Sequence, residues 1–175
     1  CYDASRKMYN PLKEMILAPT DSAGKRVVAA TFGDDVRYEG GRSKKHTGLD
    51  LYAPEGTPVY AMYDGKISDR KYVVSQPNRN KESSRWPEDY SGDKDGAGNR
   101  FIIESQINGD TYYFLFWHMQ AGTPVAVNPR TGNPFSPGDV VYAGEVVGYT
   151  GRTGNAYNVP FHHLHLGVQN SSYLN

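Results

Sequence analysis

The chain has 175 residues, enough for one domain with a real hydrophobic core and a flanking segment. Its 19 Lys and Arg residues balance its 19 Asp and Glu residues, so the net charge gives no argument for binding nucleic acid or an anionic membrane. No stretch approaches the roughly 20 apolar residues that a membrane-spanning helix needs. The 19 glycines, 11 prolines and 14 tyrosines favour strands joined by turns.

Residues 1–25 differ from the rest of the chain. The only cysteine is Cys1, so an internal disulfide and a cysteine-rich zinc site are excluded. Its place at the first residue has two interpretations: a boundary of the given sequence, or the lipid-bearing cysteine of a mature bacterial lipoprotein. Apolar side chains continue up to Leu17, but Pro11 interrupts them, which predicts a short helix or a docked arm.

From Arg26 onward, short segments rich in β-branched and aromatic residues alternate with turn signals. The predicted strands are 26–32, 49–53, 58–62, 65–68, 100–106, 111–119, 140–143 and 163–168. Strands of this length and spacing predict an all-β fold. Its core is expected to be an antiparallel sandwich or barrel-like structure, preceded by the short N-terminal arm or helix.

The five histidines lie in three separate places with strand-like or turn-like surroundings. The first place is the run from His46 to Asp50. On a straight strand these two side chains would share a face but lie about 13 Å apart, too far to hold one ion. Gly48 allows the backbone to bend and bring them together. Taken alone, a surface histidine beside a turn is the commoner interpretation of this run.

The second place holds His163 and His165. On a strand they point the same way, with Cα atoms about 6.6 Å apart, while Leu164 points into the opposite layer. The third place is His118, which ends an apolar strand. A hydrogen-bonded histidine at the edge of the core is the commoner outcome for such a residue.

Together these places offer a metal site. Two histidines and one aspartate make three protein ligands and leave a fourth position for water, which is typical of a catalytic zinc site. Three further histidines remain to handle protons. No His-Glu-x-x-His run occurs, which excludes the helix-borne zinc protease design with its glutamate base.

Several runs occur in a characteristic order. They are Phe32-Gly33, His46-Thr47-Gly48-Leu49-Asp50, Gly56-Thr57-Pro58-Val59-Tyr60-Ala61, Asp64-Gly65-Lys66-Ile67, Trp117-His118-Met119, Gly144-Glu145-Val146-Val147-Gly148-Tyr149-Thr150-Gly151-Arg152-Thr153-Gly154 and His163-Leu164-His165-Leu166. In this order and spacing, over residues 31–168, the chain resembles the lysostaphin-type (LytM-like) zinc endopeptidases of bacterial cell walls.

The resemblance implies that one Zn²⁺ per chain is bound by His46, Asp50 and His165. It also implies that His118 and His163 are the catalytic pair, which activates the zinc-bound water and stabilises the oxyanion. All five positions hold the expected residue type. The implied protein is a zinc-dependent endopeptidase that hydrolyses peptide cross-links or stem peptides of bacterial peptidoglycan. It would act in the extracytoplasmic cell envelope, as a periplasmic protein, a lipoprotein or a secreted protein.

The chain also departs from the family pattern. His162 stands where relatives often have proline or a small residue, and an exposed strand-end histidine is the favoured interpretation. Phe116 stands where relatives commonly have tyrosine, so that position supplies no hydroxyl. Some relatives have lost metal ligands, so a non-catalytic wall-binding or amidase-activating module of the same fold is the alternative function. A zinc hydrolase of another amide or ester is a second rival.

The expected organisation is an N-terminal arm at 1–25 and a zinc metallopeptidase domain at 26–175, with an insertion at 71–99. The insertion is polar, charged and too long for an ordinary hairpin connection. Its flanking residues, Ser68 and Arg100, belong to strands that lead towards the site. The insertion is therefore expected to lie at the rim of the substrate groove, to select substrate and to contribute little to folding.

Overall fold

The computed structural model describes residues 8–24, 30–39 and 42–170. Over these residues the regular secondary structure is β, apart from one short 3₁₀ turn. Its elements are β1 (Asp35–Glu39), β2 (Arg42–Lys45), β3 (Leu49–Tyr52), β4 (Pro58–Tyr60), β5 (Gly65–Ile67), β6 (Asn99–Ile107), β7 (Asp110–Met119), β8 (Val140–Val141), β9 (Val146–Tyr149), the 3₁₀ turn η1 (Gly154–Ala156) and β10 (His163–Asn170). The predicted all-β class is confirmed. Within the described ranges, no helix has the length and apolarity needed to cross a bilayer.

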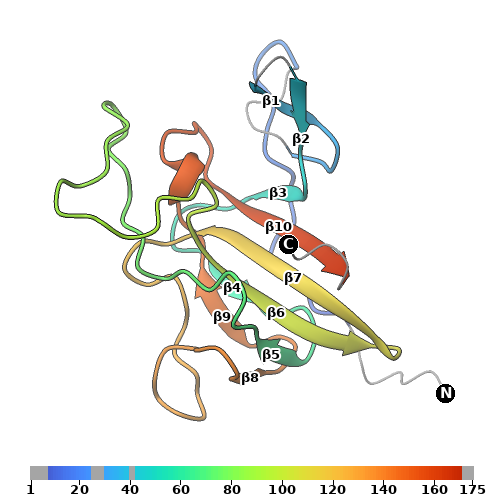
Figure 1. The fold of residues 1–175 in the computed structure, drawn as a ribbon. Helices are drawn as coiled ribbons and strands as arrows, with labels where there is room; N and C mark the ends of the chain where they lie inside the picture. Colours follow the sequence, from blue (N-terminus) through green and yellow to red (C-terminus); the bar gives the residue numbers. More distant parts are fainter. Residues whose placement is uncertain (1–7, 25–29, 40–41, 171–175) are drawn as a thin grey trace.

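The strands form one six-stranded sheet in the order β3-β10-β7-β6-β5-β8, with two ribbons, β1-β2 and β4-β9. Every pair is antiparallel. The long strands β6 and β7 are joined by Asn108 and Gly109, which both have positive φ, as a two-residue hairpin turn requires. Figure 1 shows β10 lying along β7 at the centre of this sheet, with β3 on its other side.

The core lies between the six-stranded sheet and the β4-β9 ribbon. Alternate residues of β6 and β7 face it, and Phe101 and Phe116 stack there with ring centroids 5.2 Å apart. A Cβ added to Gly148 of β9 would meet the side chains of Met119 and Phe101, so the ribbon lies directly on the sheet. Burying each such large side chain contributes about 1.5–3 kcal/mol. This packing fixes the central strands on which the site is built.

The N-terminal segment is an extended arm. The Tyr52 N–H donates to Ile16 O (2.7 Å) and the Ala18 N–H donates to Asp50 O (3.2 Å), so the arm pairs along the outer edge of β3. Leu12 is fully buried in the core. Pro11 and this edge pairing favour extended backbone over the helix that was the other expectation. Cys1 lies outside the described residues, as does most of the predicted strand 26–32.

The other seven predicted segments each contain a strand. Three strands were not predicted: β1 and β2 lie in a charged stretch, and β9 is only four residues long. β1 and β2 pair with each other and β9 pairs with β4, so none of the three belongs to the six-stranded sheet.

The insertion at 71–99 has little regular structure but is anchored at both ends. Val73 forms a β-bridge with Arg100, and the Tyr72 hydroxyl donates to Phe135 O. Gln76 is fully buried. Arg100 is buried too and pairs with carboxylates of the insertion at 3.1 and 3.4 Å. These anchors argue against the expectation that this segment contributes little to folding, which unfolding experiments can test.

Candidate metal centre and its neighbouring histidines

The backbone from His46 to Asp50 bends, as it must if both side chains are to reach one metal ion. His46 lies ahead of β3 and Asp50 within it, and His46 Nε2 is 3.1 Å from Asp50 Oδ1. A Cβ on Gly48 would lie 2.4 Å from Leu166 O and 2.9 Å from His165 Nε2. Only glycine allows the chain to pass so close to β10.

The third member of the cluster comes from the neighbouring strand. Asp50 and His165 are paired residues of β3 and β10, and His165 Nδ1 is 3.0 Å from Asp50 Oδ1. Leu164 points the other way and is fully buried in the core. The predicted alternation of this strand is confirmed: it directs His163 and His165 to one face.

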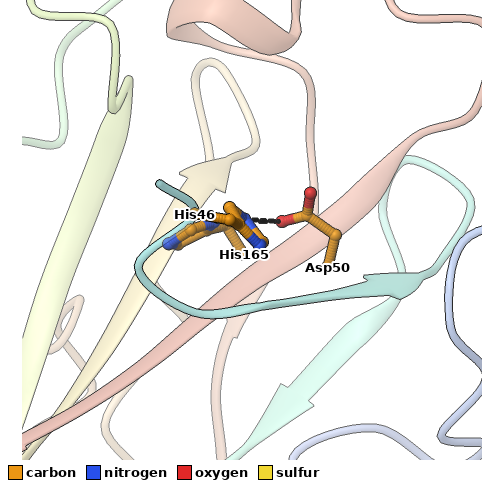
Figure 2. Close-up of side chains that lie close together, drawn as sticks. All are labelled: His46, Asp50 and His165. Atoms are coloured by element: carbon orange, nitrogen blue, oxygen red, sulfur yellow. Dashed lines mark hydrogen bonds and ion pairs between the residues drawn. The ribbon is translucent and has the colours of Figure 1, made fainter. Parts of the chain in front are cut away.

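Three potential ligand atoms therefore meet at one point, and Figure 2 shows the side chains converging. They are His46 Nε2, Asp50 Oδ1 and His165 Nδ1, separated from one another by 3.0–3.1 Å. Zinc with tetrahedral ligands at 2.0–2.2 Å has ligand atoms about 3.3–3.6 Å apart. The set of two imidazole nitrogens and one carboxylate oxygen fits such an ion in chemistry, and the three atoms need to move apart by only a few tenths of an ångström to hold it.

The tautomer of His46 also suits metal binding. Its Nδ1–H donates to the Thr31 carbonyl at 2.9 Å, so in the neutral ring Nε2 carries the lone pair. Burial works against ionisation of Asp50. Contacts with the His165 and His46 rings, whose protons a bound metal ion would replace, outweigh it and hold the pKa of that carboxyl well below its usual range. An ionised carboxylate and a nitrogen lone pair thus point at one position.

His118 approaches the cluster from β7. Asn99 pairs with Met119 and Phe101 with Phe116, so two residues of β7 face one of β6. This bulge puts His118 in the left-handed region at φ 62°, and bulges of this kind re-aim side chains beside active sites. Its Nδ1–H donates to the Thr153 carbonyl at 3.0 Å, which leaves Nε2 free to accept a proton.

His118 and His163 face each other, with ring centroids 5.2 Å apart. The His163 Nδ1–H donates to Phe161 O (3.2 Å), and its Nε2 lies 3.7 Å from Asp50 Oδ1. Burial, with the neighbouring histidines, lowers the pKa of His118 to about 3. Burial also lowers the pKa of His163, although the Asp50 carboxylate opposes the shift. Both rings are therefore neutral near pH 7.

The remaining histidine stands apart. His162 is partly buried, and the charges that act on it come from Glu55, Lys81 and Arg152. It is thus less exposed than expected for a strand end. Burial lowers the pKa of His162.

Sequence reasoning missed the groups that orient the histidines. Carbonyls of Thr31, Thr153 and Phe161 accept their Nδ1–H groups, and any residue type supplies a carbonyl. It also missed Trp117, whose ring stacks on His165 at 4.6 Å with a 14° interplanar angle. Trp117 stands next to His118 in a recognisable run, which was the available signal.

Comparison with known proteins adds to this geometry. The family described as Peptidase family M23 matches residues 44–175. The DD-carboxypeptidase/endopeptidase Mpg of Neisseria meningitidis is 29% identical over 118 residues, 67% of this chain and 19% of the relative. The chain thus spans about a fifth of the length of the curated relatives that it matches.

Solved structures share the fold. The catalytic domain of the antimicrobial peptidase lysostaphin from Staphylococcus simulans has a TM-score of 0.51 and 23% identity, over 83% of this chain and 80% of that one. A zinc-containing peptidase from Vibrio cholerae has a TM-score of 0.52 and 21% identity, over 94% of this chain and 37% of that one.

Proposed function

Because the chain belongs to peptidase family M23, we propose that it is a zinc-dependent endopeptidase that hydrolyses peptides of bacterial peptidoglycan. One observation carries the proposal: His46, Asp50 and His165 bring three ligand atoms within 3.0–3.1 Å of one another, beside two further buried histidines. A non-catalytic module would need neither the complete ligand set nor the second pair.

The proposed ligands hold one Zn²⁺ per chain. Asp50 would contribute the negative charge, and Thr31 O fixes the tautomer of His46 so that Nε2 is available as a ligand. When bound, zinc supplies Lewis acidity, which acidifies a water molecule and polarises the scissile carbonyl. Trp117 stacks on His165 and restrains its ring.

His118 and His163 are the proposed proton carriers. Carbonyl acceptors hold the Nδ1–H of each ring, so Nε2 of each starts as a proton acceptor. One ring takes the proton of the attacking water as the peptide carbonyl is attacked, and it can return that proton to the leaving amine. The protonated ring also places a positive charge beside the developing oxyanion. No side-chain carboxylate base is needed.

Peptidoglycan is the proposed substrate. The Neisseria relative is named a DD-carboxypeptidase/endopeptidase, and lysostaphin is described as an antimicrobial peptidase. A wall substrate requires action outside the cytoplasm, in the periplasm, at the cell surface or after secretion. Lipid attachment at Cys1, which lies outside the described residues, stays a prediction.

Digestion of purified peptidoglycan tests the function. Mass spectrometry should find newly cut peptides with the zinc-loaded protein, none after chelation, and recovery on adding zinc back. Asp50→Asn should lose both zinc and cutting, while Asp110→Asn, on the exposed β6-β7 hairpin, should keep both. Wall binding without cutting by the zinc-loaded protein would favour the non-catalytic module instead.

A further inference from the structure

His118 is held in an unfavourable backbone conformation that needs support from outside its own strand. A left-handed histidine in a strand bulge is strained and persists only when its surroundings fix it. Its N–H donates to Ala97 O (3.0 Å), and its ring donates to Thr153 O (3.0 Å). Both contacts come from segments beyond β7.

The hydroxyl of Thr153 ties this support together. It donates to Met119 O at 2.7 Å and accepts the Asn99 N–H at 2.9 Å. It therefore connects the residue after His118 with the first residue of β6. Thr153 and Asn99 are both fully buried, so water cannot replace these bonds without rearrangement.

The Asn99 side chain extends the network into the insertion. Its Oδ1 accepts the Gln76 N–H (2.8 Å), and its Nδ2 donates to Gln76 O (2.8 Å) and Gln120 O (3.2 Å). The Gln76 amide donates in turn to Asp93 O (3.0 Å) and Asp95 O (3.1 Å). A buried chain of bonds thus runs from both ends of the insertion to the ring of His118.

We propose that Asn99 and Thr153 are positioning residues for His118 and that the insertion at 71–99 is part of this support. The proposal rests on the catalytic role proposed above for His118. The insertion then acts on the chemical step by fixing where Nε2 points, besides any contact with substrate. A displacement of about 1 Å at such a group can cost about 100-fold in rate.

Thr153→Val tests the proposal, because valine keeps the shape and removes only the hydroxyl. The readouts are zinc content, kcat and KM on purified cross-linked muropeptides, and ¹⁵N NMR of the His118 ring. We expect unchanged zinc, a fall in kcat of about tenfold or more, and a KM within about threefold. The ring signals should shift from a fixed Nδ1–H tautomer to a mixture. Thr153→Ser, which restores the hydroxyl, should recover both kcat and the ring signals.

Tyr72→Phe is the matched control, since it removes a bond between the insertion and Phe135 O that leads away from His118. Its kcat and ring signals should stay as in the wild type. If Thr153→Val does not fold, Asn99→Ser takes its place. This substitution keeps the Thr153 hydroxyl, removes the side-chain amide that bonds to the Gln76 backbone, and leaves room there for water.

The proposal is overturned if the folded variant keeps wild-type kcat and ring signals, or if Thr153→Ser restores neither. The ¹⁵N signals of the metal-free protein do not depend on activity. An inactive wild type would therefore count against the proposed function, while the effect of the hydroxyl on the His118 ring would still be measured.

Discussion

At the scale of single residues, backbone carbonyls orient three of the five histidines. His46, His118 and His163 all donate Nδ1–H to a carbonyl, so all three present Nε2 to the centre of the site. The ring of His46 lies at the ligand cluster, whereas His118 and His163 face each other beside it. The same tautomer therefore suits both the proposed ligand role of His46 and the proposed proton transfer by His118 and His163.

Replacing the proposed proton carriers should separate chemistry from metal binding. His118→Ala and His163→Ala are expected to keep about one zinc per chain, because neither supplies a ligand atom to the cluster. Both should lose about 10²–10⁴-fold in kcat, the usual contribution of general acid–base catalysis. Elemental analysis and muropeptide hydrolysis measure the two effects. Loss of zinc from His163→Ala would mean that His163 and His165 have been assigned the wrong way round.

Gly48 should be intolerant of even one added methyl group. Gly48→Ala would force a Cβ against Leu166 O and His165 Nε2, so the loop must move away from β10. We expect weaker zinc binding and a loss of about 1–3 kcal/mol in stability. Gly167→Ala is the control, because its Cβ would meet only the Leu115 side chain, at 3.4 Å or more. Zinc titration and urea unfolding of both variants check the expectation; equal behaviour would contradict it.

At the scale of elements, the insertion has an outer part and an anchored part. Asn80 and Arg85 close a local turn with a 2.9 Å backbone bond, whereas Gln76 is buried and donates to the backbone carbonyls of Asp93 and Asp95. In Figure 1 this loop extends from the sheet as a long green trace. The two parts should therefore respond differently to deletion.

Shortening the outer part alone should be tolerated. Replacing residues 81–89 by a Gly-Ser turn should leave the melting temperature nearly unchanged, since loop length affects stability only slowly. Replacing residues 72–95 removes Gln76, which bonds to Asn99, and both carboxylates that pair with Arg100, so it should lower the melting temperature clearly. Thermal unfolding of the two shortened proteins compares these effects. Equal melting temperatures would show that the anchors add nothing. A fragment profile altered by the 81–89 change would support a role in substrate selection.

At the scale of the whole molecule, the sheet buries neutral histidines, and stability should depend on pH. The pKa of His118 is lowered to about 3, while in the unfolded chain it is about 6.5. Between these values the unfolded chain binds a proton that the folded chain does not, so stability is full above about pH 6.5 and falls as pH drops. The lowered pKa of His163 acts in the same direction, and the raised pKa of His46 opposes it.

Urea unfolding of the metal-free protein from pH 7 to pH 4 measures this dependence. One such histidine contributes a loss of about 1.4 kcal/mol per pH unit within its window. His118→Asn should flatten the slope strongly, whereas His162→Asn should flatten it less, because the pKa of that partly buried ring is lowered too but not to the extent of His118. Parallel slopes for wild type and His118→Asn would contradict the burial of a neutral ring.

The sequence alone determined much of this protein. Periodicity and turn signals predicted seven strand segments and the all-β class, because alternation and Gly or Asn at turns are local properties of the chain. The i, i+2 spacing of His163 and His165 already placed them on one face. The resemblance then named all five residues that the fold brings together, although their roles stay predictions until they are tested.

Only the tertiary structure decided how those residues are held. The bulge at His118 arises from pairing β7 with β6, and the fixed tautomers depend on carbonyls 15 and 35 residues away along the chain. The polar insertion was expected at the surface, yet Gln76 is buried because Asn99 satisfies its backbone groups. Polar composition predicts exposure only when no buried partner is available, and partners distant in sequence are visible only after the chain has folded.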